Sequence, residues 1–182
     1  MKNKKYIKES MKYIWHPCSQ MKHHEKTPLI PIDKAKGSWL IDFNKKKYLD
    51  VTSSWWVNLF GHNNKIIKRY ISEQLNKIEH VMLAGVTHEP AINLSKKLGK
   101  LTKLGHCSYG SDGANAVEIA LKMSSHYWQR TGNSKKNKYV YLENSYHGET
   151  IGALSVTDIP IFRKQYSSLI KPYFSSPSPD LR

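Results

Sequence analysis

Apolar residues recur every three or four positions in three stretches of the chain. These stretches are residues 65–80, 90–102 and 113–130. Such spacing lines one face of a helix, so the pattern predicts three amphipathic helices. Pro90 stands in the first turn of the second helix, where its missing N–H costs nothing. Gly132 follows the third helix as a typical C-terminal cap.

Shorter runs of aromatic and β-branched residues predict strands. They lie at residues 106–109 and 138–143, with a hairpin formed by 39–41 and 48–51. The polar first 36 residues, with their prolines, predict an extended or irregular chain. The Ser- and Pro-rich tail, 175–182, predicts a connection. Helix, strand, helix, strand, helix is the order of an α/β domain with a mostly parallel sheet.

Composition limits the classes of function. The 182 residues allow one domain with a real core, and the net charge is +15. Only four of the 29 basic residues are Arg, whereas sites that read phosphates favour the planar Arg fork. The Lys excess therefore indicates a bias spread over the chain, and nucleic-acid binding is not expected to be the main function. Cys18 and Cys107 form no CxxC pair, which predicts free thiols in a reducing compartment. No signal peptide or membrane span is predicted, so we expect a cytoplasmic protein.

The stretch Ser108 to Lys122 joins a predicted strand to a predicted helix. Its loop carries Gly110, Asp112 and Gly113. The open N–H groups at a helix N-terminus can hold a phosphate. The alternative is a plain turn in which Asp112 is the N-cap, and the stretch alone leaves both open. It has neither the GxGxxG spacing nor the GK[ST] of a P-loop.

Two further stretches could carry chemistry. Residues 143–150, ENSYHGET, follow a predicted strand, where α/β sheets bind ligands, and offer Tyr146 and His147; the alternative is an ordinary turn. The adjacent Trp55 and Trp56 would face opposite sides of a strand, so one is expected to line a pocket or an interface, the alternative being core plus subunit contact. The loop before Pro90 predicts a helix cap at Thr87 or His88. The histidines lack metal-ligand spacing, and no metal site is expected.

Together these pieces closely resemble the adenosylmethionine–8-amino-7-oxononanoate aminotransferases, which are pyridoxal-phosphate enzymes of biotin biosynthesis. The matching segments are IWHP at 14–17, SSWW at 53–56, HVMLAGVTHEPAI at 80–92, GSDGANAVEIALKM at 110–123, HYWQ at 126–129 and SYHGETIGALSVTD at 145–158. The paired tryptophans with GVTHEP distinguish this family from ornithine and γ-aminobutyrate aminotransferases. The resemblance implies fold type I and a homodimer with active sites at the subunit interface.

The resemblance also implies roles for particular residues. Gly113 and Ala114 match the positions that hold the cofactor phosphate. Tyr146 matches the tyrosine near the cofactor ring and the substrate, with His147 beside it. Trp55 matches a substrate-pocket tryptophan.

Two positions depart from the family pattern. Ala114 stands where Ser is frequent, so a hydroxyl contact to the phosphate is expected to be lost. Cys18 stands where a substrate-binding Tyr is common, which puts the affinity for donor or acceptor in question.

The implied organisation is incomplete. Residues 1–60 are expected to be an N-terminal segment with a hairpin, part of the small domain. Residues 61–182 are expected to be the first part of the large, mostly parallel cofactor-binding domain. In the family, the Schiff-base Lys and the Asp on the pyridine nitrogen come after the matched region. We therefore expect an N-terminal portion with no catalytic residue and no transamination activity by itself.

The implied reaction converts 8-amino-7-oxononanoate into 7,8-diaminononanoate, with S-adenosylmethionine as the usual amino donor. Two alternatives remain open at this point. One is a truncated basic protein that binds RNA or a partner chain. The other is a related class-III aminotransferase with a different substrate.

Overall fold

The structure is a computed structural model that describes residues 2–171 and 173–179. The chain divides into two compact units, Met1–Thr87 and His88–Arg182. Each unit is described by itself below.

The first unit is built on a small antiparallel sheet. Strands β1 (Ile32–Lys36), β2 (Trp39–Asp42) and β3 (Lys47–Leu49) lie in that order. Leu40 pairs with Tyr48, so the predicted hairpin is confirmed. Strand β1 was not predicted, because IDKAK has little apolar alternation and joins the sheet through its backbone bonds to β2. Helix α3 (Lys65–Leu75) confirms the first predicted helix, although it ends before His80.

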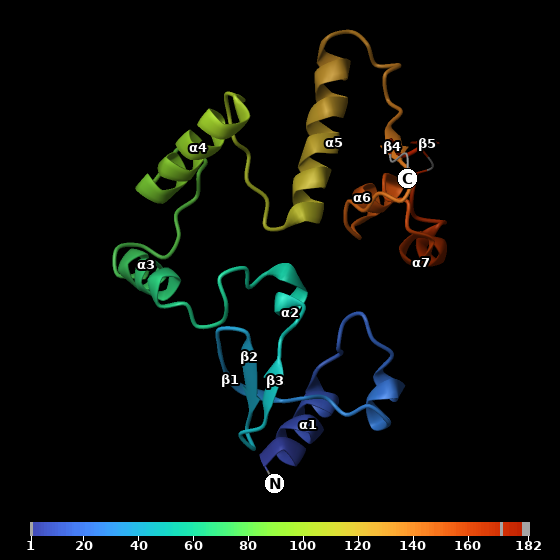
Figure 1. Cartoon of the computed structure of the whole chain (residues 1–182). Helices are drawn as coiled ribbons and strands as arrows, with labels where there is room; N and C mark the ends of the chain where they lie inside the picture. Colours follow the sequence, from blue (N-terminus) through green and yellow to red (C-terminus); the bar gives the residue numbers. More distant parts are fainter. Residues whose placement is uncertain (1, 172, 180–182) are drawn as a thin grey trace. The chain divides into compact units, whose positions relative to one another are not determined.

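The expectation of an extended or irregular chain over the first 36 residues is wrong for two segments, whereas Ile32–Lys36 is extended in β1. Residues Lys2–Tyr13 form helix α1, and Met21–Glu25 form a 3-10 turn, η1. Figure 1 shows α1 beside the sheet of this unit. The Asn3 amide donates to Asp42 Oδ2 at 2.8 Å, and the ring of Tyr6 stacks on Phe43 at 3.9 Å. These contacts with the hairpin turn support a helix whose own sequence is strongly polar.

Of the predicted order of helix, strand, helix, strand and helix, the described residues of the second unit form all but the first strand. Helices α4 (Glu89–Thr102) and α5 (Gly113–Arg130) confirm the second and third predicted helices. His88 is the N-cap of α4, since its Nδ1 accepts from the Ala91 N–H at 3.4 Å. Strand β4 (Val140–Leu142) is followed by α6 (Ile151–Ser155), α7 (Pro160–Arg163), the 3-10 turn η2 (Lys164–Tyr166) and strand β5 (Phe174–Ser176).

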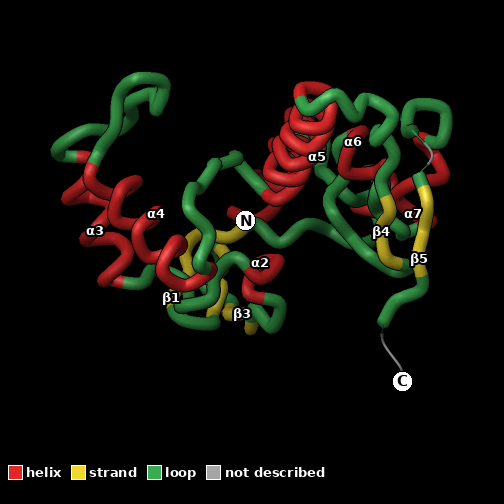
Figure 2. Tube along the Cα trace, turned by 90° about the horizontal axis from the view of Figure 1, so that it is seen from above, coloured by secondary structure: helices red, strands yellow, loops and turns green. Residues whose placement is uncertain are grey.

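Strands β4 and β5 form a parallel pair, with Tyr141 opposite Ser175. Figure 2 shows the two strands side by side. A parallel pair joined through helices is the βαβ arrangement, and it confirms the α/β class. Ser175 and Ser176 thus belong to a strand and not to a connection, because a ladder is made by backbone groups that small polar residues also carry. Residues 180–182 of the predicted connection lie outside the described residues.

The predicted strand at 106–109 is not formed. Within the described ranges, these residues take part in no ladder. Aromatic content gives a segment strand propensity, but a strand exists only through hydrogen bonds to a neighbour.

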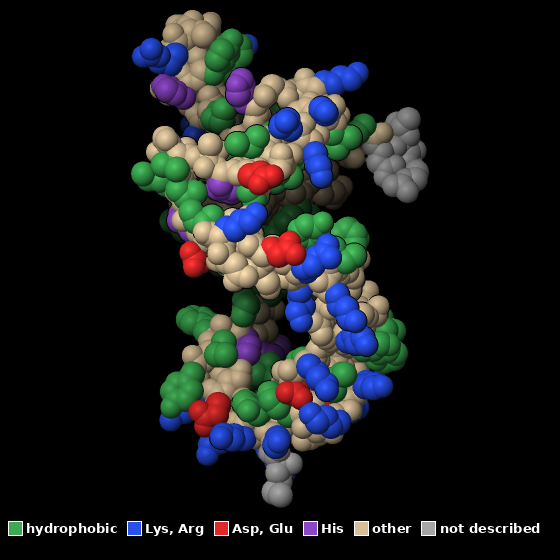
Figure 3. Space-filling model, turned by 90° about the vertical axis from the view of Figure 1, so that its left-hand side faces the viewer, with side chains coloured by type: hydrophobic (Ala, Val, Ile, Leu, Met, Phe, Trp, Pro, Cys, Tyr) green, Lys and Arg blue, Asp and Glu red, His purple; other side chains and the backbone are tan. Residues whose placement is uncertain are grey.

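Buried side chains in the described residues concentrate in the second unit. The buried hydrophobic residues are Tyr141, Ala153, Leu154 and Val156, all on β4 or in and just after α6. Thr157 is fully buried beside them. This small core lies directly behind the loop that follows β4. Figure 3 shows Lys and Arg side chains over several parts of the face that it draws, as the spread of Lys along the sequence predicts.

Candidate functional site

Helix α5 begins at Gly113 because Asp112 caps it. Asp112 has an extended backbone, and its Oδ1 accepts from the Asn115 N–H at 2.9 Å. The Ser111 hydroxyl donates to Asp112 Oδ2 at 2.9 Å. The hydrogen bond from the Asn115 N–H, followed by that from Ser111, lowers the pKa of the Asp112 carboxyl. The N-cap role left open by the sequence is therefore confirmed, and it places a carboxylate at this end of the helix.

The loop after β4 lies directly against the first turn of α5. Gly148 has a φ of +114°, which favours glycine. A Cβ added at Gly148 would come within 2.9 Å of the Ala114 Cα and would overlap the Ala114 Cβ. The close approach thus requires both the backbone freedom and the missing side chain of Gly148.

Buried Thr157 holds this loop from behind. The His147 N–H donates to Thr157 Oγ1 at 3.0 Å. The same hydroxyl lies 2.9 Å from the Ala153 carbonyl and 3.2 Å from the Gly148 carbonyl, to which it can donate. Sequence reasoning missed Thr157, because a single Thr in SVTD carries no spacing signal. Its importance comes from where the fold places it.

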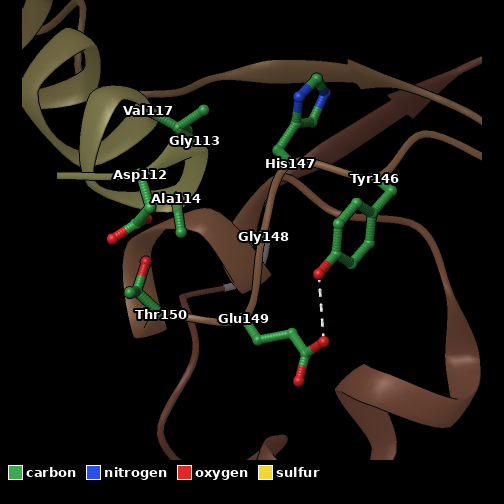
Figure 4. Close-up of a pocket in the computed structure, with 9 residues that line it drawn as sticks. All are labelled: Asp112, Gly113, Ala114, Val117, Tyr146, His147, Gly148, Glu149 and Thr150. Carbon is green, nitrogen blue, oxygen red and sulfur yellow. Dashed lines mark hydrogen bonds between the residues drawn. The ribbon is translucent and has the colours of Figure 1, made fainter. Parts of the chain in front are cut away.

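These elements line an open pocket of about 620 Å³, drawn in Figure 4. That volume is within the range of small-molecule sites. The pocket is lined by Asp112, Gly113, Ala114, Val117, Tyr146, His147, Gly148, Glu149 and Thr150. Four residues named from the sequence therefore meet at one site, namely Gly113, Ala114, Tyr146 and His147.

The side chains of the loop differ in direction. The Tyr146 hydroxyl donates to Glu149 Oε1 at 3.0 Å, whereas Figure 4 shows the His147 ring pointing away from that pair. Tyr146 is 54% exposed, so its ring offers an accessible aromatic face. The pocket thus combines a helix N-terminus with an aromatic ring, the two features that a planar phosphorylated ligand requires.

Trp55 and Cys18 belong to the first unit. Ser53–Trp56, labelled α2, forms a left-handed turn in which all four residues have φ between +49° and +65°. Asp50 supports it, accepting from the Ser54 N–H at 2.9 Å and from His62 Nε2 at 2.7 Å. The Ser54 N–H, the largest influence, and His62 lower the pKa of Asp50 to about 2.

The left-handed turn keeps both tryptophans out of the protein core. Trp55 is 59% and Trp56 is 79% exposed. Cys18 is exposed and free, with a φ of +54°. The part of this unit that the structure describes thus presents Trp55 and Cys18 as accessible side chains, and their roles toward a substrate stay predictions.

Comparison with known proteins defines the class of this one. The model of the class-III aminotransferase family matches residues 20–181. The chain therefore belongs to the class-III aminotransferases. The pocket at the N-terminus of α5 lies within the residues that the family model matches.

Its relatives point to a particular enzyme within that class. The chain is 47% identical over 170 residues to the adenosylmethionine-8-amino-7-oxononanoate aminotransferase of Helicobacter pylori, and 41% identical over 168 residues to that of Methanocaldococcus jannaschii. These alignments include 93% and 91% of this chain, but 39% and 36% of the relatives. The chain thus spans well under half the length of the curated relatives that it matches.

Solved structures agree with this assignment of fold. The crystal structure of the Methanocaldococcus jannaschii enzyme matches with a TM-score of 0.91 and 38% identity, over 97% of this chain and 41% of that one. An omega transaminase of Pseudomonas jessenii in complex with PMP matches with a TM-score of 0.86 at 20% identity, over 95% of this chain and 39% of that one. The second match supports the fold alone. The predicted fold type of pyridoxal-phosphate transferases is therefore confirmed. None of the described helices is long and apolar enough to cross a membrane.

Proposed function

We propose that these residues belong to an aminotransferase of biotin biosynthesis that converts 8-amino-7-oxononanoate into 7,8-diaminononanoate, with S-adenosylmethionine as amino donor. The observation that carries the proposal is the pocket in which GSDGANAVE and SYHGET, far apart in sequence, meet at the N-terminus of α5. The identity to the Helicobacter pylori enzyme supports the choice of substrate. The homodimer implied by the family resemblance is part of the same proposal, as is a cytoplasmic location, which the free thiols of Cys18 and Cys107 fit.

The pocket fits pyridoxal 5'-phosphate in size and in chemistry. The peptide N–H groups of Gly113 and Ala114 begin an 18-residue helix, whose dipole favours an anion at this end. Ala114 supplies no hydroxyl, so the phosphate would be held by backbone groups. Tyr146 would cover the ring, and His147 would lie beside it.

The proposed cofactor accounts for only part of the chemistry. Pyridoxal 5'-phosphate supplies an electron sink for the carbon from which the amino group leaves. The nine lining residues include Asp112 and Glu149 but no lysine. The roles proposed for this chain are therefore to bind the cofactor phosphate, to orient its ring with Tyr146 and to contribute Trp55 and Cys18 to the substrate pocket.

Cofactor binding is the direct test of this proposal. The 182-residue chain is titrated with pyridoxal 5'-phosphate, binding is followed by absorbance, and inorganic phosphate is added as competitor. Tyr146→Leu is expected to weaken binding by roughly three- to tenfold through the lost ring contact. Ala114→Ser is expected to strengthen it, because a hydroxyl would then reach the phosphate.

Tyr127 is the matched control position for Tyr146. Tyr127→Leu removes a tyrosine from the exposed part of α5, away from the pocket lining, and should leave the affinity unchanged. The assignment would be contradicted if inorganic phosphate did not compete for binding, or if neither Tyr146→Leu nor Ala114→Ser changed the affinity. Formation of 7,8-diaminononanoate from 8-amino-7-oxononanoate is then measured with the complete enzyme, using S-adenosylmethionine and other amines as donors.

A further inference from the structure

Glu118 connects helix α5 to the segment that follows the loop Tyr146–Thr150. It does not line the pocket itself. It lies on the second turn of α5, one turn after Ala114. Its Oε1 accepts from the Gly152 N–H at 2.7 Å and from the Ala153 N–H at 3.3 Å. These two N–H groups are at the start of α6, and Thr150, the residue before that helix, makes no side-chain cap bond. A carboxylate on another helix, 34 residues away from Gly152, thus takes the place of the missing cap.

This contact requires a glycine at position 152. A Cβ added at Gly152 would lie 2.7 Å from both Cδ and Oε1 of Glu118, closer than real Cβ contacts come. Any larger residue at that position would displace the carboxylate. The sequence contains no local sign of this pairing, because the two partners belong to different predicted elements.

Gly148 and Gly152 both lie against α5, one turn apart. Gly148 lies against Ala114 on the first turn of α5, and Gly152 lies against Glu118 on the second. The two glycines are four residues apart, and so are their two partners on α5. The segment that carries the pocket residues Tyr146–Thr150 is therefore attached to α5 at two successive turns, and the second attachment depends on the length of one side chain.

We propose that Glu118 is a positioning residue for this site, setting the separation between the first turn of α5 and the loop Tyr146–Thr150. The inference rests on the proposed cofactor site, since that separation is what a phosphate and a ring would have to match. Glu118 acts through the main chain at Gly152 and Ala153 and contacts no ligand itself. The length of the side chain and its acceptor oxygen are what matter, and the negative charge is secondary.

Length and charge can be separated by substitution. Glu118→Gln keeps the length and one acceptor oxygen but removes the charge. Glu118→Asp keeps the charge but is shorter by one methylene group. Glu73→Asp on α3 is the matched control, since the Glu73 side chain is 56% exposed and lies in the other unit.

Two measurements are made on the same proteins. The first is the affinity for pyridoxal 5'-phosphate, and the second is the amide exchange of Gly152 and Ala153 together with the amide chemical shifts of Tyr146 and His147. Glu118→Gln is expected within about twofold of the parent affinity, and Glu118→Asp about fivefold weaker or more, as for one lost hydrogen bond of ordinary strength. Glu118→Asp should also exchange faster at Gly152 and shift the amides of Tyr146 and His147. Glu73→Asp should match the parent in both.

The outcomes distinguish the positioning role of Glu118 from the cofactor assignment. If Glu118→Asp binds and exchanges like the parent, or if Glu118→Gln is impaired as much as Glu118→Asp, the positioning role is refuted. If the parent binds no pyridoxal 5'-phosphate, the cofactor assignment fails, and the exchange and chemical shifts alone decide about Glu118. If Glu118→Asp does not fold, Gly152→Ala displaces the same carboxylate and the same measurements apply. If neither folds, Glu118→Gln decides, because an impaired Glu118→Gln refutes the role of length.

Discussion

The hydroxyl of Thr157 is expected to hold the loop of the site in place. Thr157→Val keeps the shape of the side chain but removes the hydroxyl that accepts from the His147 N–H and donates to a carbonyl. Thr157 is fully buried, so water cannot replace these bonds. A buried polar group left without its partner costs about 1–3 kcal/mol. The Ala153 carbonyl keeps its bond from the Val156 N–H, which leaves the His147 N–H as the main loss.

We therefore expect Thr157→Val to lower the free energy of unfolding by about 2 kcal/mol. Thr157→Ser is the matched control, because it keeps the hydroxyl and removes one methyl group, at a cost of about 1 kcal/mol. Urea denaturation followed by circular dichroism measures both variants. Amide exchange at His147 adds a local readout that should accelerate in Thr157→Val and not in Thr157→Ser. Equal stability of Thr157→Val and the parent, with His147 equally protected, would refute the reasoning.

Three further predictions follow from the same contacts. Leu154→Ala removes a side chain that is 1% exposed and should lower the free energy of unfolding by about 2–5 kcal/mol, whereas Leu101→Ala, at a position that is 81% exposed, should change it by less than about 0.5 kcal/mol; urea denaturation compares them. Gly148→Ala must place a methyl group at a φ of +114° and against Ala114. It should therefore destabilise the protein by at least about 1 kcal/mol and abolish pyridoxal 5'-phosphate binding. An affinity equal to that of the parent would contradict the close approach. The pKa of Asp50 is lowered to about 2, so its stabilising effect is complete above the ordinary carboxyl value near 3.8 and disappears as the pH falls to about 2. Asp50→Asn should flatten the dependence of the free energy of unfolding on pH over that window. An unchanged slope of that dependence would argue against the role of Asp50.

Local pattern was sufficient for helices α3, α4 and α5 and for naming candidate residues of the site. Helices α4 and α5 follow from apolar spacing together with caps that their sequences carry, His88 and Asp112. Such features are local, because the cap side chain and the backbone N–H that donates to it lie within three residues of each other. The start of a helix at Gly113 was readable for the same reason, whereas the strand expected before its loop is not formed in the described residues. The family motifs then pointed to Tyr146 and His147, which the structure places in the same pocket as Gly113 and Ala114.

Long-range contacts decided the features that sequence reasoning missed. Helix α1 depends on Asp42 and Phe43, which lie on the hairpin, and the expected strand at 106–109 has no ladder in the described residues. Strands and strongly polar helices such as α1 take their stability from neighbours that are distant along the chain, so local propensity misjudges both.

The shape of the site has the same origin. The amino-acid order alone indicated which residues could hold a phosphate and a ring. The tertiary structure alone decided how closely they approach, through Gly148 against Ala114, Glu118 on the start of α6 and Thr157 behind His147. Each of these contacts joins residues at least ten positions apart. Their geometry exists only once the chain has folded, because burial and distance across elements are properties of packing and not of local sequence.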